Sequence, residues 1–147
     1  MTNTTNNSIL NILLVEDDEV DVMNVQRAFE AGKITSPLYV ASNGIEALEM
    51  LRGQPGQPSV VPPDRRLILL DLNMPQMNGL RFLQELRADE TLKHIPVVVF
   101  ATSIEDSDKI ETYGLNVAGY IHKPTKFADF VELLVAINDY WKLCEMN

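Results

Sequence analysis

The chain of 147 residues has little cysteine, little positive charge and no long apolar run. Its single cysteine, Cys144, has no partner for an internal disulfide, which fits a reducing compartment. The formal charge of −9 argues against nucleic-acid binding, because phosphates must be neutralised by basic side chains. No apolar stretch approaches the roughly 20 residues that a membrane-spanning helix needs. We therefore expect a cytoplasmic protein that binds neither nucleic acid nor membrane.

The length and composition predict a single domain. A chain of 147 residues is long enough for one core and too short for two, and 46% of the residues are hydrophobic. Residues 1–8 are rich in Asn and Thr, with neither the basic nor the apolar character of a signal peptide. We expect a disordered lead at 1–8 and one domain at 9–147, which ends in an extended helix.

Strand and helix patterns alternate along the chain. Nearly continuous apolar runs are typical of strands that are covered on both faces of a parallel sheet. Such strands are expected at 9–15, 38–41, 67–70, 97–100 and 119–121. Helices are expected at 19–31, from an Asn43 cap to 51, around 80–86, at 105–113 and at 127–143. Five strands and five helices in alternation predict an α/β fold with a doubly wound parallel sheet.

Acidic residues and one lysine follow the predicted strands at their carboxyl ends. Glu16, Asp17 and Asp18 follow the first strand, Asp71 ends the third and Lys123 follows the fifth. Taken singly, each has a plainer explanation as a helix cap, turn residue or solvated side chain. Together they fall on the edge where such sheets bind ligands, and clustered carboxylates there repel each other unless a cation is present. Oxygen ligands of this kind favour magnesium over zinc.

These residues stand in segments that resemble the receiver domains of two-component response regulators, the family of the chemotaxis protein CheY. The resemblance rests on residues 13–18, 69–75 with 78–79, 95–99 and 119–124, and it extends over about 9–138. It implies a flavodoxin-like, CheY-like fold, with a five-stranded parallel sheet in the order 2-1-3-4-5 and five helices.

The resemblance also assigns a role to each residue of the edge. Asp71 would accept a phosphoryl group from a histidine kinase, and Lys123 would contact that group. Glu16, Asp17, Asp71 and the backbone carbonyl of Asn73 would bind Mg²⁺. A receiver promotes only its own phosphorylation and dephosphorylation, so we do not expect an ordinary enzyme.

Two residues next to the site, Asp18 and Pro124, also have expected roles. Asp18 falls just past the acidic pair and is a candidate for a helix cap or for indirect support of the site. The resemblance implies a cis peptide bond before Pro124.

The sequence departs from the family at the end of the fourth strand. Receivers usually have Thr or Ser there, but counting from Pro96 gives Ala101, and Thr102 comes one residue later. A one-residue shift in a strand turns the side chain to the opposite face, so Thr102 substitutes only if the strand has ended or bulges. We expect phosphorylation to persist and to be coupled less tightly to Tyr120, the aromatic position that usually moves.

Other classes of protein compete with this interpretation. An aspartyl phosphatase has its nucleophile at the first strand with a second Asp two residues on, whereas Asp71 ends the third strand and has Asn73 two residues on. A flavodoxin has a phosphate loop rich in Ser, Thr and Gly where this chain has Glu16 and its acidic neighbours. A pseudo-receiver, which binds partners and never takes phosphate, stays open because of Ala101.

Two further features concern the output of the protein. A proline-rich insertion occupies about 53–64, and the last helix ends near Tyr140 and Trp141, which either anchor an interface or fold back on the core. Both features resemble stand-alone receivers that partner phytochrome-type histidine kinases and form homodimers. The resemblance therefore implies such a kinase and a second copy of this chain as partners.

Overall fold

A computed structural model describes residues 9–71, 79–100 and 114–144. The strands are β1 (Asn11–Val15), β2 (Leu38–Ala41), β3 (Arg66–Asp71), β4 (Val97–Phe100) and β5 (Gly119–Ile121). The helices are α1 (Glu19–Ala31), α2 (Gly44–Arg52), α3 (Gly79–Ala88) and α5 (Phe127–Leu143). The described ranges thus hold four helices rather than the five expected, because the helix predicted at 105–113 lies outside them, as does the predicted lead at 1–8.

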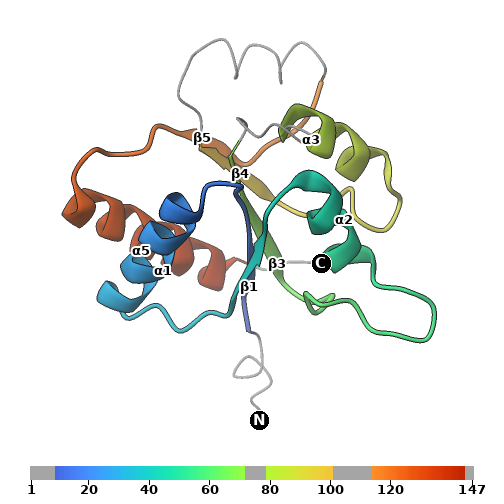
Figure 1. Ribbon diagram of the computed structural model, residues 1–147, viewed down its shortest axis with the longest axis horizontal. Coiled ribbons are helices and arrows are strands. Elements are labelled where there is room, and N and C mark those ends of the chain that lie inside the picture. Colours follow the sequence, from blue (N-terminus) through green and yellow to red (C-terminus); the bar gives the residue numbers. More distant parts are fainter. Residues whose placement is uncertain (1–8, 72–78, 101–113, 145–147) are drawn as a thin grey trace.

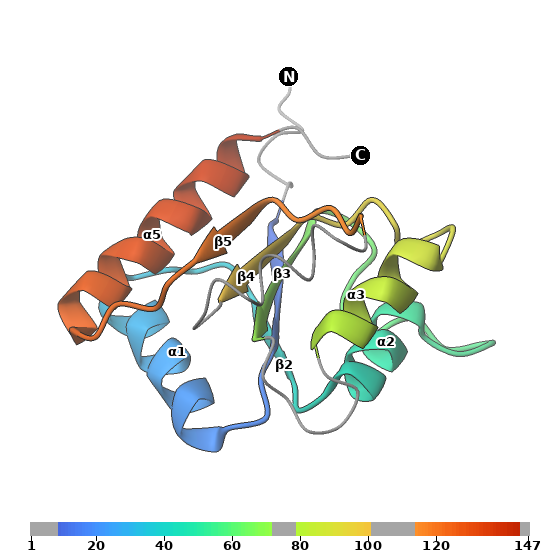
Figure 2. The same cartoon turned by 90° about the horizontal axis from the view of Figure 1, so that it is seen from above.

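The five strands form one parallel sheet in the order β2-β1-β3-β4-β5, which confirms the expected topology. Helices α1 and α5 cover one face of the sheet, and α2 and α3 cover the other (Figures 1 and 2). The sheet is therefore doubly wound. Among the described helices, none has the length and apolar character that crossing a membrane requires.

Strand β1 shows why the first apolar run lacks polar alternation. Leu13 and Val15 point into the core beneath α2 and α3, while Ile12 and Leu14 point into the core beneath α1 and α5. All four side chains are buried, and each contributes roughly 1.5–3 kcal/mol of transfer free energy. Apolar residues are needed at every position of this strand because both of its faces are covered.

Side-chain caps fix where the first two helices begin. Asp18 precedes α1 and accepts a hydrogen bond from the backbone N–H of Val20 at 2.8 Å. Asn43 precedes α2 and accepts from the N–H of Glu46 at 2.8 Å. The two capping predictions are confirmed, and the start of α1 is anchored directly after the end of β1.

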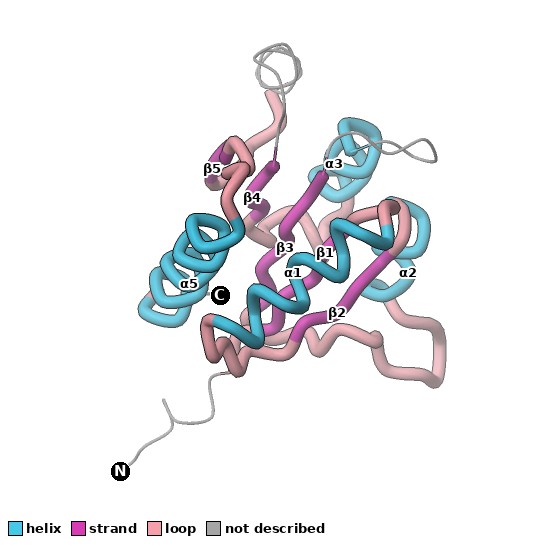
Figure 3. The backbone as a smooth tube through the Cα atoms, turned by 60° about the vertical axis from the view of Figure 1, so that its left-hand side comes forward, coloured by secondary structure: helices cyan, strands magenta, loops and turns pink. Residues whose placement is uncertain are grey.

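The proline-rich insertion follows α2 as a long loop at the amino-terminal edge of the sheet (Figures 1 and 3). Arg66, the first residue of β3, attaches this loop to the domain and is only 8% exposed. Its guanidinium donates hydrogen bonds to the carbonyl oxygens of Leu51, Val61 and Pro62 and to the hydroxyl of Ser59, over 2.7–3.1 Å. Burial lowers the pKa of this guanidinium.

Replacing Arg66 with methionine is expected to lower the free energy of unfolding by about 2–3 kcal/mol, because buried carbonyl oxygens lose their donors. Urea unfolding measures the effect. Arg27→Met on the exposed surface of α1 is the matched control and should change stability by less than about 0.5 kcal/mol. Equal effects of the two substitutions would show that Arg66 does not hold the loop.

The two aromatic residues near the end of α5 have different surroundings. Trp141 is partly buried and packs against the core beneath α1 and α5, while Tyr140 is 61% exposed. Arg65 donates to the carbonyl oxygens of Trp141 at 2.9 Å and Lys142 at 3.2 Å, which satisfies the end of the helix. The structure thus resolves the open alternative for Trp141, which folds back on its own domain.

Candidate functional site

Three side chains from separate strands meet at the carboxyl edge of the sheet. Glu16 follows β1, Asp71 ends β3 and Lys123 lies two residues after β5. Carboxylate oxygens of Glu16, Asp71 and also Asp21 lie within 4.8 Å of one another. Glu16 is only 2% exposed, and the other two acids are partly buried. The parallel topology produces this convergence, because all the strands end at the same edge.

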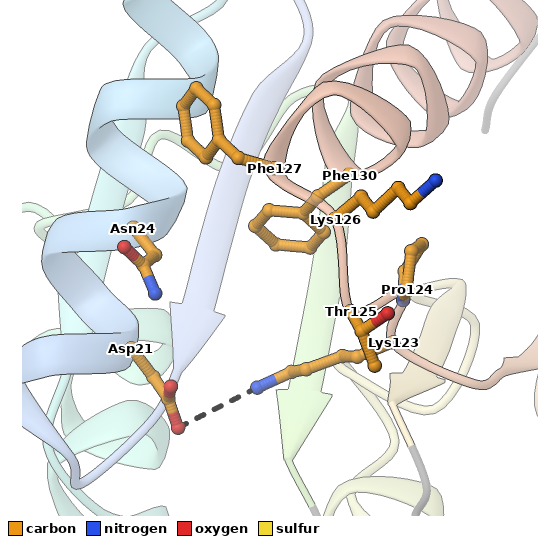
Figure 4. Close-up of a pocket in the computed structure, with 8 residues that line it drawn as sticks. All are labelled: Asp21, Asn24, Lys123, Pro124, Thr125, Lys126, Phe127 and Phe130. Carbon is orange, nitrogen blue, oxygen red and sulfur yellow. Dashed lines mark ion pairs between the residues drawn. The ribbon is translucent and has the colours of Figure 1, made fainter.

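Lys123 is the cation of the site. Its Nζ donates to Oε1 of Glu16 at 3.3 Å and lies 3.7 Å from Oδ2 of Asp21 (Figure 4). The same atom lies 5.7 Å from the ring centroid of Phe100, the last residue of β4. These contacts place the ammonium group beside two of the three carboxylates, those of Glu16 and Asp21, and near the ring of Phe100.

The electrostatics of Glu16 are unusual. Burial, a side-chain hydrogen bond with Asp71 and the negative charge of Asp71 raise the pKa of Glu16 from its ordinary 4.5 to about 8. Lys123 and the backbone N–H of Asp18 oppose the rise without cancelling it. Burial beside Asp71 therefore favours the protonated form of Glu16 in the absence of metal. Hard divalent cations prefer such closely grouped carboxylate oxygens, so this donor set fits a magnesium-like ion.

The structure brings together some of the predicted residues and not others. Asp17 is exposed and lies outside the group of three carboxylates. Asn73, Ala101 and Thr102 lie outside the described residues. Tyr120 is 37% exposed in β5, opposite Val99 of β4.

The expected cis peptide bond before Pro124 is not found. No cis peptide bond occurs among the described residues, which include Pro124. A proline lowers the cost of the cis isomer but does not fix it, since the trans form remains favoured by about 0.5–1 kcal/mol.

Sequence reasoning missed Asp21. The available signal was its position three residues after the capping Asp18, in the first turn of the helix that follows the acidic segment. A side chain in that turn stays close to the strand end from which the helix begins.

The fold and this group of residues define a class of protein: doubly wound α/β domains with acids and a lysine at the carboxyl edge of a parallel sheet. The chain belongs to the response regulator receiver domain family, whose model matches residues 12–135. Members of this family are signalling modules rather than classical enzymes.

Individual relatives agree with this assignment. Response regulator Rcp1 of Synechocystis sp. is 35% identical over 130 residues, which cover 88% of this chain and 87% of Rcp1. The structure of the phosphorylated cyanobacterial phytochrome response regulator RcpA has a TM-score of 0.76 and 34% identity, over 94% of this chain and 97% of RcpA. The Mn²⁺-bound form of Rcp1 has a TM-score of 0.73 and 34% identity, over 93% of this chain and 97% of that one.

Proposed function

We propose that the chain is a phosphorylatable response regulator, in which Asp71 accepts a phosphoryl group from a histidine kinase in a Mg²⁺-dependent reaction. The observation that carries the proposal is the meeting of Glu16, Asp71 and Lys123 at one edge of the sheet. Support also comes from relatives of which one has been seen phosphorylated and another with Mn²⁺ bound. Glu16, Asp17, Asp71 and the carbonyl of Asn73 are the proposed protein ligands of the ion.

The proposed reaction follows from the chemistry of these groups. A carboxylate oxygen of Asp71 attacks phosphorus, the P–N bond to the donor histidine breaks, and its electron pair returns to the imidazole ring. Lys123 offsets negative charge on the oxygens of the transferred group. A bound Mg²⁺ supplies the remaining positive charge. The nucleophile must be unprotonated, so the proton shared by Glu16 and Asp71 has to reside on Glu16 or leave the site.

The proposed partners are a phytochrome-type histidine kinase and a second copy of this chain, in the cytoplasm. RcpA, which is similar over nearly its whole length, is a phytochrome response regulator. On the last helix, Tyr140 and Leu143 are exposed by 61% and 86%, and such apolar surface is suited to a protein contact. We also propose that phosphorylation of Asp71 is coupled less tightly to Tyr120, because Ala101 lacks the hydroxyl that receivers usually have at that position.

The test of the proposed function is the intact mass of the protein after incubation with acetyl phosphate. We expect one phosphoryl adduct in the presence of Mg²⁺ and none when the metal is removed by chelation, because attack on an anionic donor needs the added positive charge. A matched incubation with Ca²⁺ in place of Mg²⁺ shows whether the smaller ion is required. If no small-molecule donor gives an adduct, the pseudo-receiver alternative replaces this proposal.

A further inference from the structure

We propose that Asp21 is a positioning residue that restrains Lys123 in the unphosphorylated domain and thereby weakens the hold of the site on a phosphoryl group. The inference rests on the proposed function, because it concerns the same lysine. Its basis is the ion pair between Asp21 Oδ2 and Lys123 Nζ at 3.7 Å (Figure 4). Asp21 would thus lower the affinity of the site for a phosphoryl group without taking part in the phosphoryl transfer itself.

The position of Asp21 is set by the start of α1. The capping carboxylate of Asp18 accepts from the backbone N–H of Asp21 at 3.4 Å, so this turn is held in place from within the helix. Figure 4 shows the Asp21 side chain extending from α1 toward Lys123, whose side chain comes from the segment that precedes α5. The ion pair thus joins α1 to the segment just before α5, and α1 and α5 themselves lie against each other.

The ammonium group of Lys123 has acidic partners on two sides, Glu16 and Asp21. Asp21 and Lys123 line a cavity of about 220 Å³ between α1 and the start of α5, with Asn24, Phe127 and Phe130 among its other walls. Asp71 does not line this cavity, although the same lysine also contacts Glu16 beside Asp71. The ammonium group of Lys123 is therefore shared between Glu16 and the carboxylate of Asp21, which stands at the wall of the cavity.

Two electrostatic effects of Asp21 act in the same direction. Its carboxylate competes with the phosphoryl oxygens for the ammonium group of Lys123. It also lies within 4.8 Å of a carboxylate oxygen of Asp71, so it repels an anionic group that is attached there. The pair is partly solvated, with side-chain exposures of 30% for Lys123 and 39% for Asp21, so the combined effect is moderate.

The closeness of Asp21 to Glu16 and Asp71 also allows a different role, that of a metal ligand. If Asp21 were instead a ligand of the metal, its removal would weaken the binding of Mg²⁺ and of any phosphoryl group that needs the ion. The two roles therefore predict changes of opposite sign.

The first experiment measures the affinity of Mg²⁺-loaded protein for beryllofluoride, a phosphoryl mimic, by calorimetry. Asp21→Asn is expected to bind beryllofluoride about five-fold more tightly than the native chain. The matched control is Glu19→Gln, which removes an acid from the same first turn of α1 and should change the affinity by less than about two-fold. Weaker or unchanged binding by Asp21→Asn would overturn the inference, and a parallel Mg²⁺ titration would identify a metal ligand.

The second experiment is a double-mutant cycle in metal-free protein, with Asp21→Asn and Lys123→Met followed by urea unfolding. The folding equilibrium constants are expected to be non-additive by about two- to five-fold. Additive effects would show that the two side chains are not energetically coupled in solution and would overturn the inference. Native protein that fails to bind beryllofluoride would instead refute the proposed function, while the cycle would still report on the ion pair.

Discussion

Replacing Asp71 with asparagine is expected to remove the phosphoryl adduct completely while the domain remains folded. The amide has nearly the same shape as the carboxylate but carries no negative charge and is a far weaker nucleophile. The substitution also removes a charge that raises the pKa of Glu16, so we expect this pKa to fall toward its ordinary value. Intact mass after incubation with acetyl phosphate and Mg²⁺ measures the adduct, and NMR titration of Glu16 measures the second effect.

The matched control for this substitution is Asp64→Asn, which removes one exposed carboxylate at the opposite edge of the sheet. This variant should give the same adduct as the native chain. An adduct that persists in Asp71→Asn would assign the acceptor to another side chain, and peptide mass analysis would locate it.

Local sequence patterns were enough to predict most of the strands and helices. Strand β1 was predictable because a buried parallel strand needs apolar residues on both faces, and α1 because Asp18 begins it and Gly32 follows its last residue. The order of the strands was predictable only through the resemblance to receivers. Periodicity gives no information on which strands are neighbours, since that depends on crossovers between distant parts of the chain.

The candidate site was predictable to the extent that its residues lie at strand ends. Glu16, Asp71 and Lys123 meet because parallel strands end together. The proximity of Asp21 depends on the direction in which α1 leaves the sheet, which its packing against α5 determines. Asp17 is adjacent to Glu16 in sequence yet exposed, and both lie beyond the end of β1, where the strand pattern no longer predicts which side chain points inward.

The burial of Trp141 could not be predicted from the sequence, because it too depends on how distant elements pack. An aromatic pair at the end of a helix has the same pattern whether it binds a partner or its own core. The outcome depends on where the helix ends relative to the sheet, and Arg65 holds that end by donating to two of its carbonyl oxygens. One ring packs inward and its neighbour, Tyr140, points to solvent.

The free energy of unfolding of the metal-free protein is expected to fall as the pH rises from about 4.5 to about 8. Over this range the folded state holds a proton on Glu16 that the unfolded chain releases, because burial and Asp71 raise the pKa of Glu16 to about 8. The folded state binds more protons, so the stabilising contribution is fully present below about 4.5 and is lost by about 8. Each unit of pKa difference contributes about 1.4 kcal/mol, so the loss is on the order of a few kcal/mol.

Urea unfolding at several pH values, with a chelator or with Mg²⁺, measures this dependence. Glu16→Gln should flatten the curve of the metal-free protein, because glutamine keeps a neutral polar group at every pH, while the other titrating groups remain as an internal reference. Mg²⁺ should stabilise the native chain more at pH 8 than at pH 5, since the cation takes the place of the proton between Glu16 and Asp71. Equal stabilisation by Mg²⁺ at both pH values would mean that the ion binds without displacing that proton, and Glu16 would then not be one of its ligands.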